Sequence, residues 1–448
     1  MNRRQFLGAT VGAAVALRGL ANDKPLLAAE AAAAEKTSSP ATAVAAVQHA
    51  AASARQAAFD VLQPTPRQLQ HGLELHAAGP VVESYGFSPR SAPDGDALRA
   101  ALEGGATPLE LEDLRTDQMM TRCITDAAQR AEYLAAWEAA GVTCILQNAG
   151  EECQDPLRLL RRLAHFTHVT DMLRDHVFRA VTPEDIVRAH RQRQHCLYFS
   201  GNAVPLTQRW VDAGSELDFV RLFFQLGVRM MHVTYNRRNM LGDGCAEPAN
   251  GGLSDFGRAA IAEMNRVGVI PDVAHSGWQT SLETAQVSRR PVVASHTACA
   301  GLNRHIRGKP DNVIKAICDG GGLIGICSIR SFLGGQGDLS AMLDHIDYAV
   351  KRFGAEHVAI GTDVAYLSRD DAREMQKVPR GRPARKRFES FWPADAFPLP
   401  GEHPSLAWLN WPMFTVGMVQ RGHRDDAIRK ILGDNVLRVA RAALGATA

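Results

Sequence analysis

GVIPDVAHSG, residues 268–277, contains a short apolar run that stops on a histidine, His275. Further along, PVVASHT, residues 291–297, repeats the pattern and stops on His296. A run that is apolar at nearly every position, rather than at alternate ones, is typical of a strand buried on both faces, as in a parallel sheet covered by helices. The fold class therefore depends on how many such runs the chain contains and on what lies between them.

Eight β-rich runs are spread along the chain. They cover residues 80–85, 141–147, 195–200, 227–235, 268–275, 291–296, 321–328 and 357–363. Between most of them lie stretches with helical periodicity. Residues 254–268 open on Ser254 and residues 311–321 open on Asp311 or Asn312, which are good N-cap types, and both stretches end at glycine. Eight strands alternating with helices predict a (β/α)8 TIM barrel, and a doubly wound open sheet is the alternative.

Composition and charge exclude several classes of protein. The chain has 448 residues, of which 46% are hydrophobic and 22% charged, as in a globular protein. A net charge of +2 and short basic runs argue against nucleic acid as a partner. No apolar run in the body reaches the roughly 18 residues of a transmembrane span. The eight cysteines form no CxxC pair, and their even number permits disulfides without showing them.

The N-terminus predicts a targeting segment. MNRRQFLGATVGAAVALRGLA, residues 1–21, has paired arginines, then Phe6 and Leu7, then a weakly apolar stretch, and this pattern resembles a twin-arginine export signal. We expect the signal to cover residues 1–34, an Ala-rich linker or pro-segment to cover 35–60, and the barrel domain to cover 61–448. The mature protein is then expected in the periplasm or outside the cell.

Three of the predicted strands end on residues that can bind a metal. In a TIM barrel the chemistry lies at the carboxyl ends of the strands. His275, His296 and Asp363 each end a predicted strand, and Tyr235 ends a fourth. Two imidazoles and a carboxylate are ligands that a borderline cation such as Zn²⁺ accepts. The sequence therefore predicts a polar functional centre at this end of the barrel, with a metal bound in it.

Four segments resemble the membrane dipeptidase family (renal dipeptidase, peptidase family M19), which belongs to the amidohydrolase-like barrels. The resemblance runs from about residue 195 to the C-terminus. It rests on GGLSDFGRAAIAEMNRVGVIPDVAHSG (251–277), PVVASHTACAGLNRHIRGKPDN (291–312), HVAIGTDV (357–364) and RGHRDDAIRKILGDNVLRV (421–439). Their order and spacing make the resemblance specific.

The resemblance implies a role for each candidate site residue. His275 and His296 correspond to two histidines that ligate one of the family's two zinc ions. Arg307 corresponds to the arginine that holds the substrate carboxylate, which an arginine fork matches with two N–H groups. Asp363 corresponds to an aspartate that touches the metal or the attacking water and shuttles a proton. Tyr235 stands where the family has a histidine on the substrate side.

The first and third strands depart from the family pattern. Tyr85 and Phe87 stand where the family has a His-x-Asp metal pair, and Ser200 stands where it has a bridging glutamate. Phenylalanine cannot bind a metal and tyrosine does so rarely. We therefore expect zinc at no more than one ion per chain.

Other polar side chains are candidates for the missing ligands or for the pocket. A carboxylate or thiol could come from Glu83, Asp243, Cys245 or Glu247. His232 is expected to be a packed or barrel-facing histidine, and His305 could line the pocket. The Pro-rich segment 377–412, which contains Trp392, Trp408 and Trp411, is expected to form a lid or a subunit contact, which leaves a homodimer open.

These features support three hypotheses about function. The first is an exported, metal-dependent hydrolase of dipeptides or related small amides whose substrate carries a carboxylate. The second is a single-metal or metal-free barrel enzyme that acts on a different small-molecule bond. The third is a non-catalytic binding protein on a degenerate dipeptidase scaffold. Fold alone does not separate them.

Overall fold

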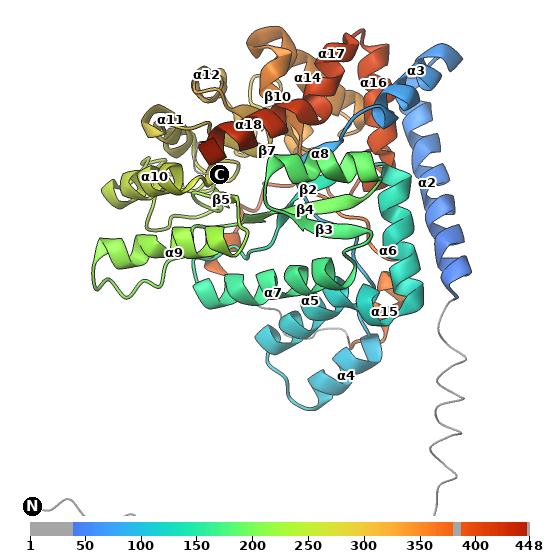
Figure 1. Ribbon diagram of the computed structural model, residues 1–448, viewed down its shortest axis with the longest axis horizontal. Helices are drawn as coiled ribbons and strands as arrows, with labels where there is room; N and C mark the ends of the chain where they lie inside the picture. Colours follow the sequence, from blue (N-terminus) through green and yellow to red (C-terminus); the bar gives the residue numbers. More distant parts are fainter. Residues whose placement is uncertain (1–38, 380–386, 446–448) are drawn as a thin grey trace, which may run out of the picture. The chain divides into compact units, whose positions relative to one another are not determined.

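The computed structural model describes residues 39–379 and 387–445, and the chain from Pro40 onward forms one compact unit. The predicted export signal, residues 1–34, lies outside the described residues. Most of the predicted linker, by contrast, is part of the folded unit. Helix α2 (Pro40–Leu62) packs along α6 (Ala127–Ala140), as Figure 1 shows. Alanines on its buried face let the two helices approach closely, so the domain begins at Pro40 rather than at residue 61.

Eight parallel strands form the barrel, in the order in which they occur along the chain. They are β1 (Val82–Gly86), β2 (Cys144–Asn148), β4 (His195–Gly201), β5 (Met230–His232), β6 (Ile270–Asp272), β7 (Val293–Cys299), β9 (Leu323–Ile326) and β10 (Val358–Ile360). Each overlaps one of the eight predicted β-rich runs, so the predicted TIM barrel is confirmed and the open sheet is not. Several strands are shorter than the apolar run that contains them, because their last residues turn into the loops of the site.

Two further strands were not predicted. β3 (Val177–Ala180) pairs with the first half of β4, and β8 (Gly308–Lys309) pairs with the last two residues of β7. Both are short, and neither has the continuous apolar run on which the prediction depended. The β8 pairing matters for the site, because it holds the segment with Arg307 and Lys309 against the end of β7.

Helices surround the barrel (Figure 1). In addition to α2 and α6 they are α3 (Pro66–Ala77), α4 (Gly95–Glu103), α5 (Pro108–Thr125), α7 (Pro156–Met172), α8 (Pro183–Gln192), α9 (Ala213–Gln225), α10 (Asp255–Val267), α11 (Trp278–Val287), α12 (Asp311–Asp319), α13 (Arg330–Leu333), α14 (Leu339–Phe353), α15 (Asp371–Gln376), α16 (Trp411–Gln420), α17 (Asp425–Arg429) and α18 (Asn435–Leu444). Within the described residues, none combines the length and hydrophobicity that crossing a membrane requires.

The predicted helix boundaries agree with the structure in one case and differ in the other. Ser254 caps α10 by accepting a hydrogen bond from the backbone of Gly257, and Gly268 ends the helix with a φ of 99°. At α12, Pro310 occupies the N-cap position and Asp311 is the first helical residue. Proline supplies no side-chain cap, so the start of this helix depends on its packing.

Helix α18 closes the amino-terminal end of the barrel. Its apolar residues Val436, Val439 and Ala440 pack against the side chains that point inward from the first half of each strand. Small residues let the strands converge in the interior. A Cβ on Gly325, for example, would lie 2.0 Å from the carbonyl oxygen of Ser295. The closed end leaves the carboxyl ends of the strands as the place for a functional site.

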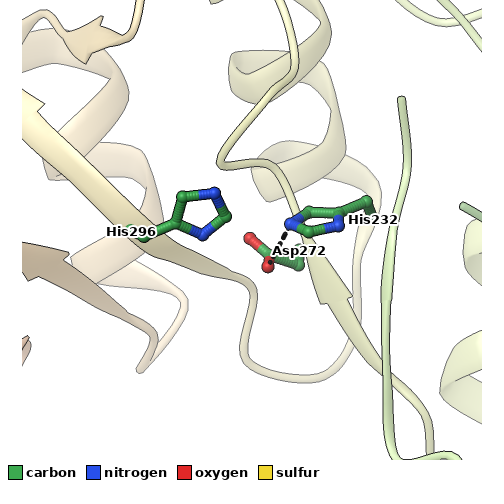
Figure 2. A group of neighbouring side chains, drawn as sticks. All are labelled: His232, Asp272 and His296. Atoms are coloured by element: carbon green, nitrogen blue, oxygen red, sulfur yellow. Dashed lines mark ion pairs between the residues drawn. The ribbon is translucent and has the colours of Figure 1, made fainter. Parts of the chain in front are cut away.

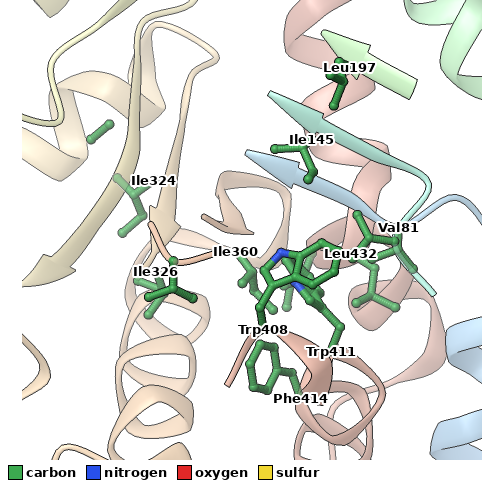
Figure 3. Close-up of a cluster of buried hydrophobic side chains, with 14 of the residues drawn as sticks. Val81, Ile145, Leu197, Ile324, Ile326, Ile360, Trp408, Trp411, Phe414 and Leu432 are labelled. Carbon is green, nitrogen blue, oxygen red and sulfur yellow. The ribbon is translucent and has the colours of Figure 1, made fainter. Parts of the chain in front are cut away.

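Two of the three tryptophans expected in a lid lie in the core. Trp408 and Trp411 pack with Phe414 against the outward-facing side chains of the strands, such as Ile145 and Ile360 (Figure 3). Both are almost fully buried. The segment from Ser405 to Trp411 therefore belongs largely to the hydrophobic core, whereas Trp392 lies near the site.

The first strand is joined to the last by a buried carboxyl group. Glu83 of β1 accepts hydrogen bonds from the backbone N–H and the hydroxyl of Thr362, just after β10, and from the indole N–H of Trp408 at 2.9 Å. Glu83 thus closes the barrel and points away from the centre that His275 and His296 occupy. Burial raises the pKa of this carboxyl group to about 8, although the three hydrogen bonds lower it in part.

This pKa makes the stability of the fold depend on pH. The ordinary pKa of glutamate is 4.5, so the folded protein retains a proton that the unfolded chain loses. The resulting stability is fully present below about pH 4.5 and is lost as the pH rises through about 8. We expect the free energy of unfolding to fall by roughly 3 kcal/mol between about pH 5 and about pH 8.

Denaturant unfolding of the parent protein and of Glu83→Gln at several pH values measures this effect. The substituted protein should lose the part of the slope that Glu83 contributes, because its amide does not titrate. Glu74→Gln, at an exposed position of α3, is the control and should keep the slope. An equal slope in all three proteins would contradict the assignment to Glu83.

Candidate metal centre

Three buried side chains from neighbouring strands meet inside the carboxyl end of the barrel. His232 is the last residue of β5, Asp272 is the last residue of β6, and His296 lies in β7. The pairing register places His232 opposite Asp272 and Asp272 opposite Val293. All three side chains are completely buried, and their potential ligand atoms lie within 4.8 Å of one another (Figure 2). We refer to them as the His–Asp–His cluster.

Asp272 is held in one orientation by its neighbours. It accepts hydrogen bonds from the backbone N–H of Ala274 at 2.9 Å, from the backbone N–H of Ser295 at 3.1 Å and from the Ser295 hydroxyl. Burial alone would raise the pKa of this carboxyl group. His232 and the hydrogen bonds from Ser295 outweigh burial and hold the pKa below its ordinary value, so Asp272 is an anionic ligand candidate.

His296 is fixed by one hydrogen bond and one ring contact. Its Nδ1 lies 2.8 Å from the hydroxyl oxygen of Ser295, and its ring stacks on that of Tyr85 with centroids 3.9 Å apart. Burial, and then the charge of Arg307, lower its pKa well below the ordinary value. The imidazole is therefore neutral, which is the form that binds metals.

His275 lies beside the cluster but is not a member of it. Its ring centroid is 5.0 Å from that of His296. Nδ1 is 2.8 Å from the side-chain oxygen of Asn236, and the ring stacks on Tyr235 with centroids 3.8 Å apart. The ring centroid of Trp392, from the segment predicted as a lid, lies 6.2 Å from that of His275. Of the two predicted ligands, the structure brings His296 together with other donors and leaves His275 at the rim.

Arg307 reaches the site from the loop before β8 and is completely buried. It donates one hydrogen bond to the carbonyl of Ala274 and another, at 3.1 Å, to the carbonyl of His296. Its Nε is buried and has no hydrogen-bond partner among the described residues. The guanidinium group therefore links the loop after β6 to strand β7, and its Nε–H remains available to a ligand.

Asp363 follows β10 and has a left-handed backbone conformation, with a φ of 61°. Such a conformation is strained for a residue with a side chain and is common at functional sites. Burial raises the pKa of its carboxyl group to about 6, and the charges of Arg307 and His232 limit the rise. Asp363 is thus a carboxylate near the cluster that can exchange a proton close to neutral pH.

The first strand supplies aromatic rings to the site. The Tyr85 hydroxyl donates a hydrogen bond of 2.6 Å to Asn202, and its ring lies edge-on to Phe87 with centroids 5.7 Å apart. Ser200 is completely buried, and within the described chain its hydroxyl has no hydrogen-bond partner. The side of His296 that faces β1 is therefore covered by the ring of Tyr85.

The candidate replacement ligands have other partners. Glu83 closes the barrel, as described above. Asp243 binds Arg238 and accepts a hydrogen bond of 2.7 Å from the backbone of Gly251. Glu247 accepts from the backbone of Arg238 at 3.1 Å. The Cys245 thiol is close to the site, 3.7 Å from the side-chain oxygen of Asn236, but it is not part of the His–Asp–His cluster.

Sequence reasoning missed Asp272 altogether, and it predicted His232 as a packed or barrel-facing histidine without a role in the site. A signal was present, because both are polar residues at an inward position two after an apolar core residue, Met230 or Ile270. A charged side chain in a barrel interior needs a partner. His305, expected to line the pocket, bonds through Nε2 to the carbonyl of Ala396 in the lid segment.

Comparison with known proteins identifies the family of this chain. The family model of the membrane dipeptidases (peptidase family M19) matches residues 127–378, which is more than half of the chain. The chain belongs to this family. The match includes the His–Asp–His cluster, His275, Arg307 and Asp363, whereas the aromatic residues Tyr85, Phe87 and Trp392 lie outside it.

Known relatives of this membrane dipeptidase family member align with different shares of its length. A dipeptidase, verJ, from Clonostachys rogersoniana is 28% identical over 225 residues, so the chain spans about half the length of this curated relative. A solved structure described as an amidohydrolase from Pseudomonas aeruginosa aligns with 83% of this chain and 98% of its own, with 24% identity and a TM-score of 0.60. A metallopeptidase from Rhodobacter sphaeroides, solved with a phosphinate mimic of L-Ala-D-Ala, aligns with 82% and 99%, at 17% identity and a TM-score of 0.55. These two likenesses support the fold.

Proposed function

We propose that this protein is a metal-dependent hydrolase of dipeptides or related small amides. The observation that carries the proposal is the set of buried imidazoles and carboxylates at the carboxyl ends of β5, β6, β7 and β10, in a chain of the membrane dipeptidase family. A relative of this chain is named a dipeptidase, and a structural neighbour holds a dipeptide mimic. Both support a small peptide as the substrate.

The donor atoms in the structure fit a divalent metal ion. Both ring nitrogens of His232 and Nε2 of His296 are buried and lack hydrogen-bond partners within the described chain. A buried, unsatisfied polar atom costs about 1–3 kcal/mol, and a metal ion would remove that cost. Two imidazole nitrogens with one carboxylate are a donor set that zinc accepts, and the aromatic rings of Tyr85 and Phe87 favour a single ion. Zinc at one ion per chain is therefore part of the proposal.

The chain's own residues then have distinct tasks. A bound zinc ion lowers the pKa of a water molecule and so supplies a nucleophile near neutral pH. Asp363, which has a pKa of about 6, accepts the proton of the attacking water and can return it to the leaving amine. The free Nε–H of Arg307 is available to a substrate carboxylate. Tyr235, half-buried over His275, covers the substrate side.

Export through the twin-arginine pathway is the proposed localisation. It is supported by Arg3 and Arg4 ahead of a weakly apolar stretch. Fractionation of cells that express the full-length chain tests it, and a parent protein that stays in the cytoplasm would argue against it.

Hydrolysis of a dipeptide panel by the purified full-length protein tests the main proposal. We expect amine release from dipeptides with L,L or L,D stereochemistry, loss of activity on chelation, and recovery on addition of one equivalent of Zn²⁺ per chain. Activity that survives complete metal removal would overturn the metal-dependent mechanism. Hydrolysis of lactones or carbamoyl compounds but of no dipeptide would favour an enzyme acting on another bond, and binding without turnover would favour a non-catalytic protein.

A further inference from the structure

The protonation of His296 can be read from its neighbours. The Ser295 hydroxyl has a single hydrogen and donates it to Asp272, so it accepts the hydrogen bond from Nδ1 of His296. Nδ1 therefore carries the ring proton, and Nε2 carries a free lone pair. Ser295 thus orients both the carboxylate and the imidazole, as the residues behind metal ligands commonly do.

The contact between His232 and Asp272 is close but is not a hydrogen bond. Nε2 of His232 lies 3.0 Å from a carboxylate oxygen of Asp272. By the geometric criteria for a hydrogen bond, neither nitrogen of the ring has a partner in the described part of the chain. Two ligands around a tetrahedral zinc ion, with bonds of about 2.0–2.1 Å, lie about 3.3 Å apart. The spacing therefore suits two atoms that share an ion.

His275 differs from His232 in each of these respects. Its Nδ1 is occupied by Asn236, its ring face is covered by Tyr235, and it is not among the side chains whose ligand atoms lie within 4.8 Å of one another. The family resemblance points to His275 and His296 as the ligand pair. The geometry instead joins His296 to the two residues that end β5 and β6.

We propose that His232, Asp272 and His296 are the protein ligands of a single zinc site, set deeper in the barrel than the His275–His296 pair implied by the family. This site deepens the proposed hydrolase function and rests on it for the role of the ion. Three protein ligands leave a fourth position for water or substrate, as in catalytic zinc sites. His275 is then a positioning residue beside the site, with its ring stacked on Tyr235.

Loading of the metal-free, full-length protein with Co²⁺ tests the ligand set without reference to activity. Bound cobalt per chain is measured directly, and the visible spectrum reports its coordination. We expect the parent to bind one ion and His275→Ala to bind it nearly as well. His232→Ala and Asp272→Ala should bind it at least roughly 100-fold more weakly, because loss of even a residue behind a ligand costs about 10- to 100-fold.

Cysteine variants provide a spectroscopic signal for ligation at a chosen position. His232→Cys should keep a ligand at this position and acquire a thiolate-to-cobalt charge-transfer band. His275→Cys, the matched control, should have no such band, and neither should the parent despite its native Cys245. Circular dichroism and thermal unfolding of each variant show whether it has folded.

The opposite pattern would overturn the inference. If His275→Cys gains the band and His275→Ala loses the metal while His232→Ala retains it, the family pair binds the ion, and the proposed hydrolase stands without this ligand set. If the parent binds no cobalt, both the ligand set and the metal-dependent mechanism fail. If the His232→Cys band appears but the parent cleaves no dipeptide, the ligand set stands and the proposed function fails.

Discussion

Replacing Asp363 with asparagine should lower kcat for dipeptide hydrolysis by roughly 100- to 10,000-fold, the usual contribution of a positioned general base. The substitution keeps the size of the side chain and removes its ability to accept a proton. Burial raises the pKa of this carboxyl group to about 6. The parent should therefore lose activity as the pH falls through about 6, where Asp363 becomes protonated, and a nearby metal ion would move this limb to lower pH.

Steady-state kinetics and a metal assay together separate a catalytic role from a structural one. Asp363→Asn should lose turnover and the acidic limb of its pH profile while keeping the ion, because Asp363 is outside the His–Asp–His cluster. Asp370→Asn is the matched control, since Asp370 is also buried in the segment after β10 but pairs with Arg373. A kcat for Asp363→Asn within a few-fold of the parent would contradict its role as the base.

Replacing Arg307 with alanine should raise KM for dipeptides with a free C-terminus by roughly 30- to 700-fold, or about 2–4 kcal/mol. The guanidinium group is completely buried and keeps its Nε–H without a partner in the described part of the chain. A substrate carboxylate would meet a charge with no water around it, where a charged hydrogen bond is strong. Arg307→Lys should recover only part of the affinity, because a single ammonium group cannot replace the guanidinium bonds to both carbonyls and also meet the substrate.

Arg307 also supports the site, so the experiment needs a reference substrate. Its other donors bind the carbonyls of Ala274 and His296, and their loss should cost stability in addition. Comparison of each free-acid dipeptide with its C-terminal amide isolates the carboxylate. The parent should prefer the acid strongly and Arg307→Ala should not. Equal KM values for acid and amide in the parent would show that Arg307 is structural only.

Local sequence was sufficient to locate the barrel. A buried parallel strand is apolar at nearly every position, so GGLIGICS at 321–328 identified β9, and the other seven runs identified their strands equally well. Helix α10 was bounded by Ser254 and Gly268, because caps act within one turn of the helix end. These features depend on residues a few positions apart, which is why the chain's order alone reveals them.

Other parts of the fold gave no such local signal. Helix α2 is so rich in alanine that its buried face is hardly distinguishable from its exposed face by sequence. Only its packing along α6 decides that it belongs to the domain. Glu83 was considered as a metal ligand until the structure showed its bonds to Thr362 and Trp408, which are far away in sequence. Burial of a side chain depends on partners that a strand's own residues do not specify.

In the site, too, the sequence indicated some residues and only the tertiary structure indicated the others. The sequence motifs located His296, Arg307 and Asp363, because the carboxyl ends of barrel strands meet at one place whatever their exact register. His232 and Asp272 became candidates only in the structure. The register of β5 against β6 sets them opposite each other, and their potential ligand atoms lie close to those of His296. A metal ion requires donor atoms placed to within a fraction of an ångström, and that placement results from strand pairing and side-chain packing across the whole barrel.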